Sequence, residues 1–284
     1  MIASEIWLML IVATAISLIS GAFGIGGGTL TVPFLIFVGS MHWPNDDASG
    51  LAHTAVAISL LTALFLSISA SASNILSRRI HFLPGIIVSL FSLPGSYLGV
   101  EISGVLSFRS LALIFAAIVT ITGIVGFFRK SSSGKKTKDI PQYNNGRRPA
   151  PGRSQIFFYG LAGFFVGILS ALTGLGGGVV LVPLFLWTLP GAEPAEAVAT
   201  SSFCIIFSAF YGSVLYAVQQ NYIPLPQPSV GHYYLPYAIP FGIGALIGGF
   251  AGAALKNKVK GLHLKRGFAA IQILAGLAVA IRAI

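Results

Sequence analysis

Long apolar runs that are almost free of charged residues alternate with short polar segments along the whole chain. A helix that crosses a bilayer needs about 17–25 mostly apolar residues. Six runs have this length, and they cover residues 51–74, 82–100, 107–128, 196–218, 234–255 and 267–283. Because backbone polar groups find no partner in lipid, only helices and closed barrels can span a membrane. We therefore predict an all-α integral membrane protein.

Two further apolar stretches, 6–39 and 155–189, are too long for a single crossing. Each holds about 34 residues, or roughly 51 Å of helix, whereas the hydrocarbon core is about 30 Å thick. The runs Gly24-Ile25-Gly26-Gly27-Gly28 and Gly174-Leu175-Gly176-Gly177-Gly178 interrupt them. Each glycine costs about 1 kcal/mol in a helix interior relative to alanine, so the helix is expected to unwind there. We predict two half-helices in each stretch, joined by a glycine-rich turn and entering and leaving on the same side.

The two glycine clusters lie 150 positions apart, and the similarity continues around them. Ser20 matches Ser170 at the same offset, and an apolar stretch followed by proline ends both motifs at Pro33 and Pro183. Further along, 95–99 resembles 244–248 in its small residues. Matches in the same order indicate an internal repeat. The predicted units are a first transmembrane repeat at 1–128, a basic linker at 129–154 and a second repeat at 155–284.

The composition agrees with a membrane protein and shows where the positive charge lies. Hydrophobic residues make up 55% of the chain and charged residues 8%, against about 25% in soluble domains. The net charge is +10, but fifteen of the seventeen Lys and Arg lie in three short segments between apolar runs, at 78–79, 129–153 and 256–266. Such clusters are typical of cytoplasmic loops rather than of a nucleic-acid-binding surface, so no nucleic-acid partner is expected.

Charge also predicts how the two repeats are oriented. The loop after the second element carries Arg78 and Arg79 in the first repeat, whereas its counterpart at 219–233 has no charged residue. The next loop shows the reverse bias, because the second repeat carries its basic cluster there, at 256–266. The positive-inside rule then predicts two repeats of inverted topology, a cytoplasmic linker and both termini outside. The linker is interpreted as a plain tether, with a regulatory role left open.

Interrupted helices in both halves of an inverted repeat are typical of secondary transporters. Each break is predicted to expose backbone N–H groups at the start of the following half-helix. A helix N-terminus carries about +0.5 charge and favours a small anion. The predicted substrate-binding residues in the two breaks are Gly24, Gly26, Gly27, Gly28, Thr29, Gly174, Gly176, Gly177 and Gly178.

The breaks contain no Lys or Arg, so dipoles and hydroxyl groups would have to hold the anion. The plain spans carry no acidic residue away from their ends, so we expect no metal site, and we expect no cofactor and no catalytic residues. The spacing Gly24-x-x-x-Gly28, repeated at Gly174 and Gly178, also fits close helix packing. Packing is the preferred interpretation for the similar pairs in 95–99 and 244–248.

Polar residues open the helix after each broken segment and could face it. In the second repeat Thr200 and Ser201 are predicted to donate hydrogen bonds to the substrate, or else to bond to carbonyls of their own helix. In the first repeat His53 and Thr54 are candidates for coupling or gating, since histidine can change its charge near neutral pH. A histidine near a helix end is also common at the membrane interface, and that alternative stays open.

The paired glycine motifs, ending at Pro33 and Pro183, resemble the TauE/SafE sulfite-exporter family, also called the toluene-sulfonate uptake permease family. The sequence Ala-x-Ala-Thr-Ser at 197–201, the small residues at 244–248 and the basic loop before the last span add to the resemblance. It covers nearly the whole chain except the linker, although the first repeat lacks the Thr-Ser pair. The resemblance implies transport of sulfite, sulfoacetate or other organosulfonates across the bacterial cytoplasmic membrane.

We therefore expect a multi-pass secondary transporter for a small sulfur-containing anion that works by alternating access, and not an enzyme. An anion channel and a non-transporting membrane scaffold or assembly protein are the alternatives. The lipid bilayer and the anion are the expected partners, and a homo-oligomer stays open.

Overall fold

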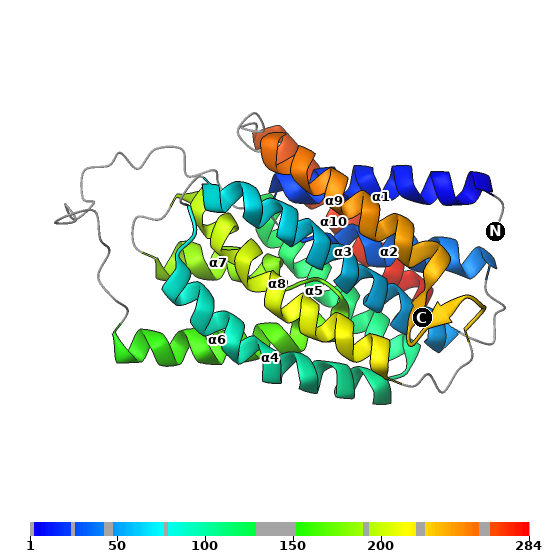
Figure 1. Cartoon of the computed structure of the whole chain (residues 1–284), viewed down its shortest axis with the longest axis horizontal. Helices are drawn as coiled ribbons and strands as arrows, with labels where there is room; N and C mark the ends of the chain where they lie inside the picture. The colour runs from blue at the N-terminus through cyan, green and yellow to red at the C-terminus, as the bar shows by residue number, and fades with distance from the viewer. Residues whose placement is uncertain are drawn as a thin grey trace.

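The computed structural model describes residues 3–23, 26–42, 48–76, 79–128, 152–189, 193–219, 225–255 and 262–283. Ten helices and one short hairpin of strands occupy these residues (Figure 1). The elements are α1 (Ala3–Phe23), α2 (Gly28–His42), α3 (Ala48–Leu76), α4 (Phe82–Val105), α5 (Phe108–Phe128), α6 (Arg153–Thr173), α7 (Gly178–Thr188), α8 (Pro194–Val218), β1 (Ser229–Val230), β2 (Tyr233–Tyr234), α9 (Leu235–Leu255) and α10 (Leu262–Ala283).

The helices confirm an all-α integral membrane protein. Within the described part of the chain, seven helices are long and apolar enough to cross a bilayer, namely α1, α3, α4, α5, α6, α8 and α9. The six predicted spans coincide with α3, α4, α5, α8, α9 and α10. The strands β1 and β2 form a two-stranded antiparallel hairpin between α8 and α9, with Ser229 opposite Tyr234. This hairpin was not predicted.

Both predicted breaks are present, but the first helix of each broken stretch is longer than a half-helix. The helices α1 and α6 each have 21 residues, and they end at Phe23 and Thr173 before the glycine turns. The following helices are short, with 15 residues in α2 and 11 in α7. The expectation of two half-helices is therefore wrong for α1 and α6. In α6 the exposed first turns, from Arg153 on, extend beyond the packed bundle.

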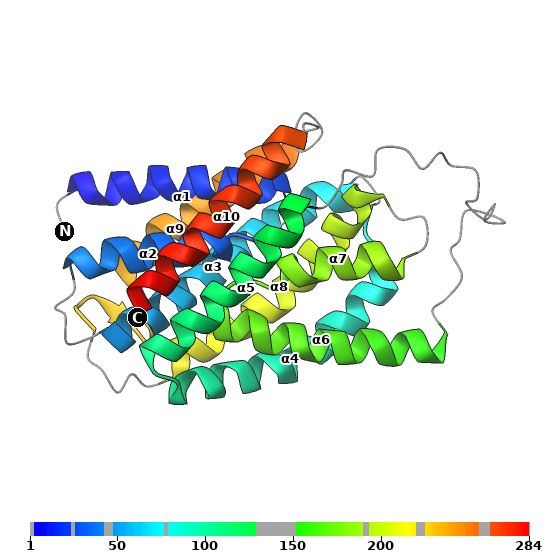
Figure 2. The same ribbon diagram turned by 180° about the vertical axis from the view of Figure 1, so that it is seen from behind.

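The two broken segments enter the bundle from opposite ends. The outer ends of α1 and α2 lie at the end of the molecule where both chain termini are drawn (Figures 1 and 2). The outer ends of α6 and α7 lie at the other end, which also holds the C-terminal end of α5 and the connection into α4. Which of these ends faces the cytoplasm stays a prediction, and so does the inverted orientation of two repeats in a bilayer.

The two halves of the chain interlock. The principal helix pairs are α1 with α9, α6 with α4, α5 with α10 and α3 with α8, and in addition α3 contacts α9 and α8 contacts α4. Exchanging α1–α5 for α6–α10 leaves this set of pairs unchanged. The first helix of each half therefore packs on the fourth helix of the other.

Small residues allow this close approach. A Cβ atom built on Gly99 would lie 2.6 Å from the carbonyl oxygen of Ile168 in α6, and one on Gly248 would lie 2.5 Å from that of Thr14 in α1. These glycines lie in the runs 95–99 and 244–248, so packing, the preferred interpretation from the sequence, is confirmed.

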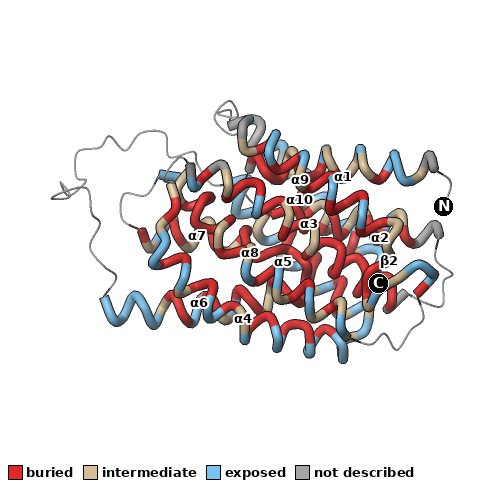
Figure 3. Tube along the Cα trace, in the orientation of Figure 1, coloured by how far each residue is buried: buried red, intermediate tan, exposed pale blue. Residues whose placement is uncertain are grey.

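The long helices α3 and α8 form the centre of the bundle (Figure 3). Within α3, 78% of the apolar span is buried, compared with 33% in α5 at the periphery. Large apolar side chains point outward from the outer helices, among them Leu90, Phe128 and Phe165. A surface of this kind suits lipid, whereas the buried centre contains many hydroxyl groups.

Candidate functional site

The two glycine turns contact each other inside the bundle. A Cβ atom on Gly26 would lie 2.8 Å from the carbonyl oxygen of Leu175, and one on Gly28 would overlap with the carbonyl group of Gly174. Only glycine fits at these positions without moving the opposite backbone. The breaks, 150 positions apart in sequence, therefore form a single structural unit.

Both turns use backbone conformations that favour glycine. Gly26 has φ 86°, and Gly174, Gly176 and Gly177 have φ 72°, 73° and 79°. These left-handed residues end one helix and start the next within a few positions. Thr31 closes the first turn of α2 by donating its N–H to the carbonyl of Gly27, and Leu181 donates in the same way to Gly177. The helices α2 and α7 thus both begin where the two turns contact each other.

Five hydroxyl groups near these turns or at the starts of α3 and α8 are buried and have no hydrogen-bond partner among the described residues. They belong to Ser20, Thr29, Thr54, Ser170 and Ser201, all of which are at most 2% exposed. An unsatisfied buried hydroxyl costs about 1–3 kcal/mol. Such groups are commonly satisfied by an ordered water or a ligand. Buried side chains without a described partner also occur elsewhere in the bundle, at Ser17, Ser71, Ser213 and Gln272.

Ser20 also lines a small cavity of about 10 Å³, the space of roughly one water molecule. The cavity lies between the first glycine turn and the central helices, because Gly26, α3 and α8 supply the rest of its wall. Its lining residues are Ser20, Gly21, Gly26, Leu66, Ser67, Ala70, Ser202 and Ile205. Three hydroxyl-bearing side chains thus converge on one space beside the break.

A hydrogen bond ties the first half of the chain to the second turn. Ser59 of α3 donates its hydroxyl to the carbonyl oxygen of Gly174 at 2.7 Å. The bond satisfies a carbonyl that the left-handed turn would leave without a helical partner. Nothing in the sequence pattern around Ser59 predicts this contact, because it depends on how α3 packs across the other half.

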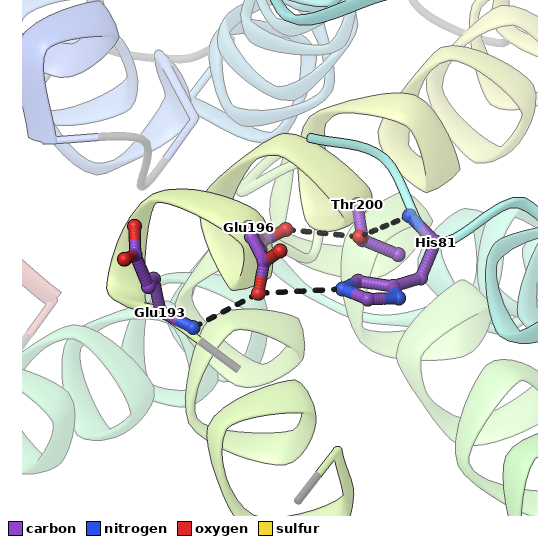
Figure 4. A network of polar contacts seen from close by, with 4 residues as sticks. All are labelled: His81, Glu193, Glu196 and Thr200. Carbon is purple, nitrogen blue, oxygen red and sulfur yellow. Dashed lines mark hydrogen bonds and ion pairs between the residues drawn. The ribbon is translucent and has the colours of Figure 1, made fainter. Parts of the chain in front are cut away.

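Thr200 lies in a different polar cluster (Figure 4). Its hydroxyl donates to the carbonyl oxygen of Glu196 at 2.9 Å and accepts the backbone N–H of His81 at 3.0 Å. The His81 ring lies 3.6 Å from the Glu196 carboxylate, which also caps the start of α8 through the N–H of Glu193. Of the two alternatives for Thr200, bonding to its own helix is thus the one observed, whereas its neighbour Ser201 keeps an unpartnered hydroxyl.

His53 is buried beneath the β1–β2 hairpin. Its Nε2 atom lies 2.8 Å from the carbonyl oxygen of Ser103, and its ring centroid lies 5.4 Å from that of His232. Tyr216 of α8 donates its hydroxyl to Ser103 at 2.8 Å and lies edge-on to His232. At 8% exposure His53 belongs to this buried cluster, and its position relative to the membrane interface stays a prediction.

His232 lies in the hairpin, outside the membrane-spanning helices, and faces His53 and Tyr216. Burial first, and then the charge of His53, lower the pKa of His232 from 6.5 to about 4. The unfolded chain therefore takes up this proton at a higher pH than the folded hairpin does. The free energy of unfolding is then highest above about pH 6.5 and falls as the pH drops from 6.5 towards 4.

We expect the melting temperature of the detergent-purified protein to fall by several degrees between these two pH values. The variant His232→Gln has no titrating imidazole at this position. Its melting temperature should therefore depend less on pH than that of the wild-type protein when the two are melted in parallel. Identical pH profiles for the two proteins would contradict the assignment.

Gly24 lies outside the described residues. No group of three or more His, Cys, Asp or Glu side chains that could hold a metal ion occurs in the described ranges. Sequence reasoning did not single out the buried hydroxyl groups of Ser20 and Ser170, although their matching positions in the repeat offered a signal. No signal in the sequence pointed to His232, because it becomes a neighbour of His53 only in the folded chain.

Comparison with known proteins agrees with this architecture. Residues 9–279 match the family described as sulfite exporter TauE/SafE. The chain is 28% identical to the probable membrane transporter protein YunE of Bacillus subtilis, over 88% of this chain and 89% of that protein. It is 25% identical to a probable membrane transporter protein of Haemophilus influenzae, over 96% and 97% of the two chains.

A third relative is the probable membrane transporter protein MJ0441 of Methanocaldococcus jannaschii, 24% identical over 91% of this chain and 89% of that one. No solved structure matches the chain significantly. The family match extends from α1 to α10 and includes both glycine turns. The chain is thus a multi-pass membrane protein that belongs to the sulfite exporter TauE/SafE family.

Proposed function

We propose that the protein is a secondary transporter that moves a small sulfur-containing anion, such as sulfite or an organosulfonate, across the cytoplasmic membrane by alternating access. The observation that carries this proposal is the contact between the two glycine turns, with unpartnered buried hydroxyl groups around it. Bare helix N-termini and hydroxyls are the donors that a small oxyanion needs. The family match and the names of the relatives support transport as the activity.

In this mechanism the glycine residues at 26–28 and 174–178 let the anion approach the backbone, and Thr29 and Ser201 supply hydroxyl donors. Thr200 acts at a distance from the anion, by fixing the start of α8 against the His81 backbone. Movement of α2 and α7 against the central helices α3 and α8 would open the site to one side and then to the other. Donors of this kind also let the anion leave, since no fixed opposite charge retains it.

Polar clusters lie at both ends of the central helices and suit the closing contacts of such a cycle. The His81–Glu196 cluster joins the α3–α4 connection to α8 at one end. At the other end, His53 and Tyr216 both bond to Ser103 at the end of α4. We assign His53 the role of a coupling or gating residue, with Thr54 beside it as a buried unpartnered hydroxyl.

Flux measurements with the purified full chain in liposomes test the proposal. We expect uptake of radiolabelled sulfite or methanesulfonate that saturates with concentration and is accelerated by the same anion inside the vesicle. An imposed proton gradient should drive accumulation by the wild type but not by His53→Gln, which should still exchange anions. Uptake without saturation would indicate a channel, and no flux of any sulfur-containing anion would favour a scaffold.

A further inference from the structure

The β1–β2 hairpin places a second histidine against His53. The ring centroids of His53 and His232 lie 5.4 Å apart, and both side chains are more than nine-tenths buried. His53 belongs to α3, whereas His232 is held over it by a hydrogen bond from its own backbone N–H to the carbonyl oxygen of Tyr216 in α8, 3.0 Å away. The pair therefore joins the hairpin to the two central helices.

The hydrogen bonds of the pair decide which nitrogen atoms can take up a proton. The Nε2 atom of His53 lies 2.8 Å from the carbonyl oxygen of Ser103, which can only accept, so Nε2 carries the hydrogen in the neutral ring. The Nδ1 atom of His53 is then the basic one. The Nδ1 atom of His232 is buried and has no hydrogen-bond partner among the described residues.

The pair can hold one proton but resists a second. Burial, and then the charge of His53, lower the pKa of His232 to about 4. Two neutral tyrosines, Tyr216 from α8 and Tyr233 next to His232 in the hairpin, are the titratable groups that face the pair, and burial raises the pKa of Tyr233 further. The charged side chains at this end of α4 and α5, Glu101 and Arg109, are exposed. Above about pH 4 the two rings therefore share at most one proton.

Tyr216 connects this pair with the second glycine turn. Its ring lies edge-on to that of His232 at 5.5 Å, and its hydroxyl oxygen lies 2.8 Å from the hydroxyl of Ser103 and 3.1 Å from the carbonyl oxygen of Ala171. Ala171 lies in the last turn of α6, just before the turn at Gly174. Carbonyl groups in the last turn have no partner within their own helix, so Tyr216 satisfies one that the break leaves open.

The Tyr216 hydroxyl has one proton and two possible acceptors. If it donates to the Ala171 carbonyl, the Ser103 hydroxyl can donate to Tyr216, and if it donates to Ser103, the Ala171 carbonyl loses its bond. Ser103 also accepts from His53 through its carbonyl oxygen, and that bond strengthens when His53 carries a charge. The protonation state of the pair is thus positioned to bias how the end of α6 is held.

We propose that Tyr216 is a positioning residue that couples a proton shared by His53 and His232 to movement of the second glycine turn. The inference rests on the proposed function, and it adds His232 and Tyr216 to the coupling role assigned to His53. With each anion carried, the pair takes up one proton on one side of the membrane and releases it on the other.

Accumulation in liposomes tests this coupling, with labelled methanesulfonate as the probe because it keeps its single charge at every pH used. The membrane potential is clamped at zero, and the outside is more acidic than the inside by about one pH unit. One proton per anion then supports about tenfold accumulation inside the vesicle. Exchange of labelled for unlabelled methanesulfonate at equal pH measures transport without net movement of protons.

Tyr216→Phe keeps the buried ring and removes the hydroxyl group. We expect exchange near the wild-type rate but no accumulation above the outside concentration, and the same result for His232→Gln. The double variant His53→Gln/His232→Gln should lose no more than either single variant, because one proton is shared. Ser103→Ala keeps the carbonyl oxygen that His53 contacts but removes the link to Tyr216, so accumulation should fall here as well.

Tyr159→Phe is the matched control. Tyr159 is a buried tyrosine near the start of α6, and its hydroxyl donates to the carbonyl oxygen of Thr188 at the end of α7, 3.4 Å away. It therefore also satisfies a helix end, but it lies at the opposite end of α6 from Ala171. Accumulation by this variant should match that of the wild type.

The possible outcomes separate this inference from the proposed function. Saturable exchange without proton-driven accumulation by the wild type would overturn the coupling and leave transport in place. Full accumulation by Tyr216→Phe would remove Tyr216 from the coupling, and an equal loss of exchange and accumulation would leave it a structural role only. Ser103→Ala decides the same question if Tyr216→Phe does not fold. If folded wild-type protein exchanges no sulfur-containing anion, the proposed function fails, and this inference fails with it.

Discussion

Gly28→Ala is expected to lower anion transport at least about a hundredfold while the protein still inserts into the membrane. The added methyl group would overlap with the carbonyl oxygen of Gly174 and come within 2.6 Å of the Cα atom of Leu175. These are backbone atoms, so relief requires the two turns to move apart. Separating them by about 1 Å would misplace the donors of both helices, an error that can cost about a hundredfold in activity.

The measurement is exchange in liposomes, normalised to the amount of folded protein found by size exclusion and thermal melting. Gly126→Ala is the matched control, because its methyl group would lie 3.7 Å from Ala269 in ordinary contact. Gly27→Ala is a milder variant, since its methyl group would lie 3.0 Å from the Thr62 side chain and 3.7 Å from that of Leu66, and a partial loss is expected. Normal transport by both turn variants would reject the glycine turns as the site.

We expect the same loss of transport from substitutions in the second turn, which lies in the other half of the chain. Gly177 has φ 79°, and a Cβ atom there would lie 2.6 Å from the Val166 side chain. A bulky residue such as leucine should therefore abolish transport at Gly177 as it should at Gly27. Comparable losses in both halves would fit one shared site, whereas a loss confined to one half would point to a site built by that half alone.

Sequence reasoning succeeded where local rules decide the structure. Apolar length sets the number of long helices, and four glycines in five residues are enough to break a helix at Gly28 or Gly178 whatever packs around it. The repeat offset further allowed the second break to be matched to the first. These features need only the chain itself and the thickness of a bilayer.

Features that depend on contacts between distant segments were not predictable in this way. Thr200 was expected near the anion because it opens the helix after the break, but its hydroxyl accepts a hydrogen bond from the backbone N–H of His81, 119 positions away. The pairing of His53 with His232 and the bond from Ser59 to Gly174 also cross between the two halves. A single sequence does not show which distant segments pack together. It can therefore identify polar candidate residues, but it cannot show which of them lie near one another.

The difference between local rules and contacts between distant segments also explains why the fold and the site place different demands on glycine. At the turns, glycine supplies left-handed backbone and allows close contact with neighbouring atoms, as at Gly26 and Gly176. Along α4, α6 and α9, glycine has ordinary helical backbone and only shortens the distance between helices. Substitutions of the first kind should damage transport before they damage folding, and substitutions of the second kind should do the reverse.

Gly167→Val provides the strongest test of the second kind, and we expect it to lower the melting temperature by roughly 10 °C. A Cβ atom on Gly167 would overlap with the carbonyl oxygen of Ser92 and lie 2.9 Å from the backbone nitrogen of Ser96, both in α4. Because α6 contacts α4 along much of its length, the helices must separate to admit the side chain. Overpacking of this kind costs about 3 kcal/mol, which corresponds to a shift of that size.

Gly267→Val is the matched control, because Gly267 is an exposed helical glycine with no atom within 4 Å of its built Cβ. Its melting temperature should change by no more than about 2 °C, since only helix propensity is altered. Gly248→Val, at the related contact of α9 with α1, should behave like Gly167→Val. If Gly167→Val melts like the control, α4 and α6 do not pack as closely as the structure requires, and the glycine turns lose the support that holds them together.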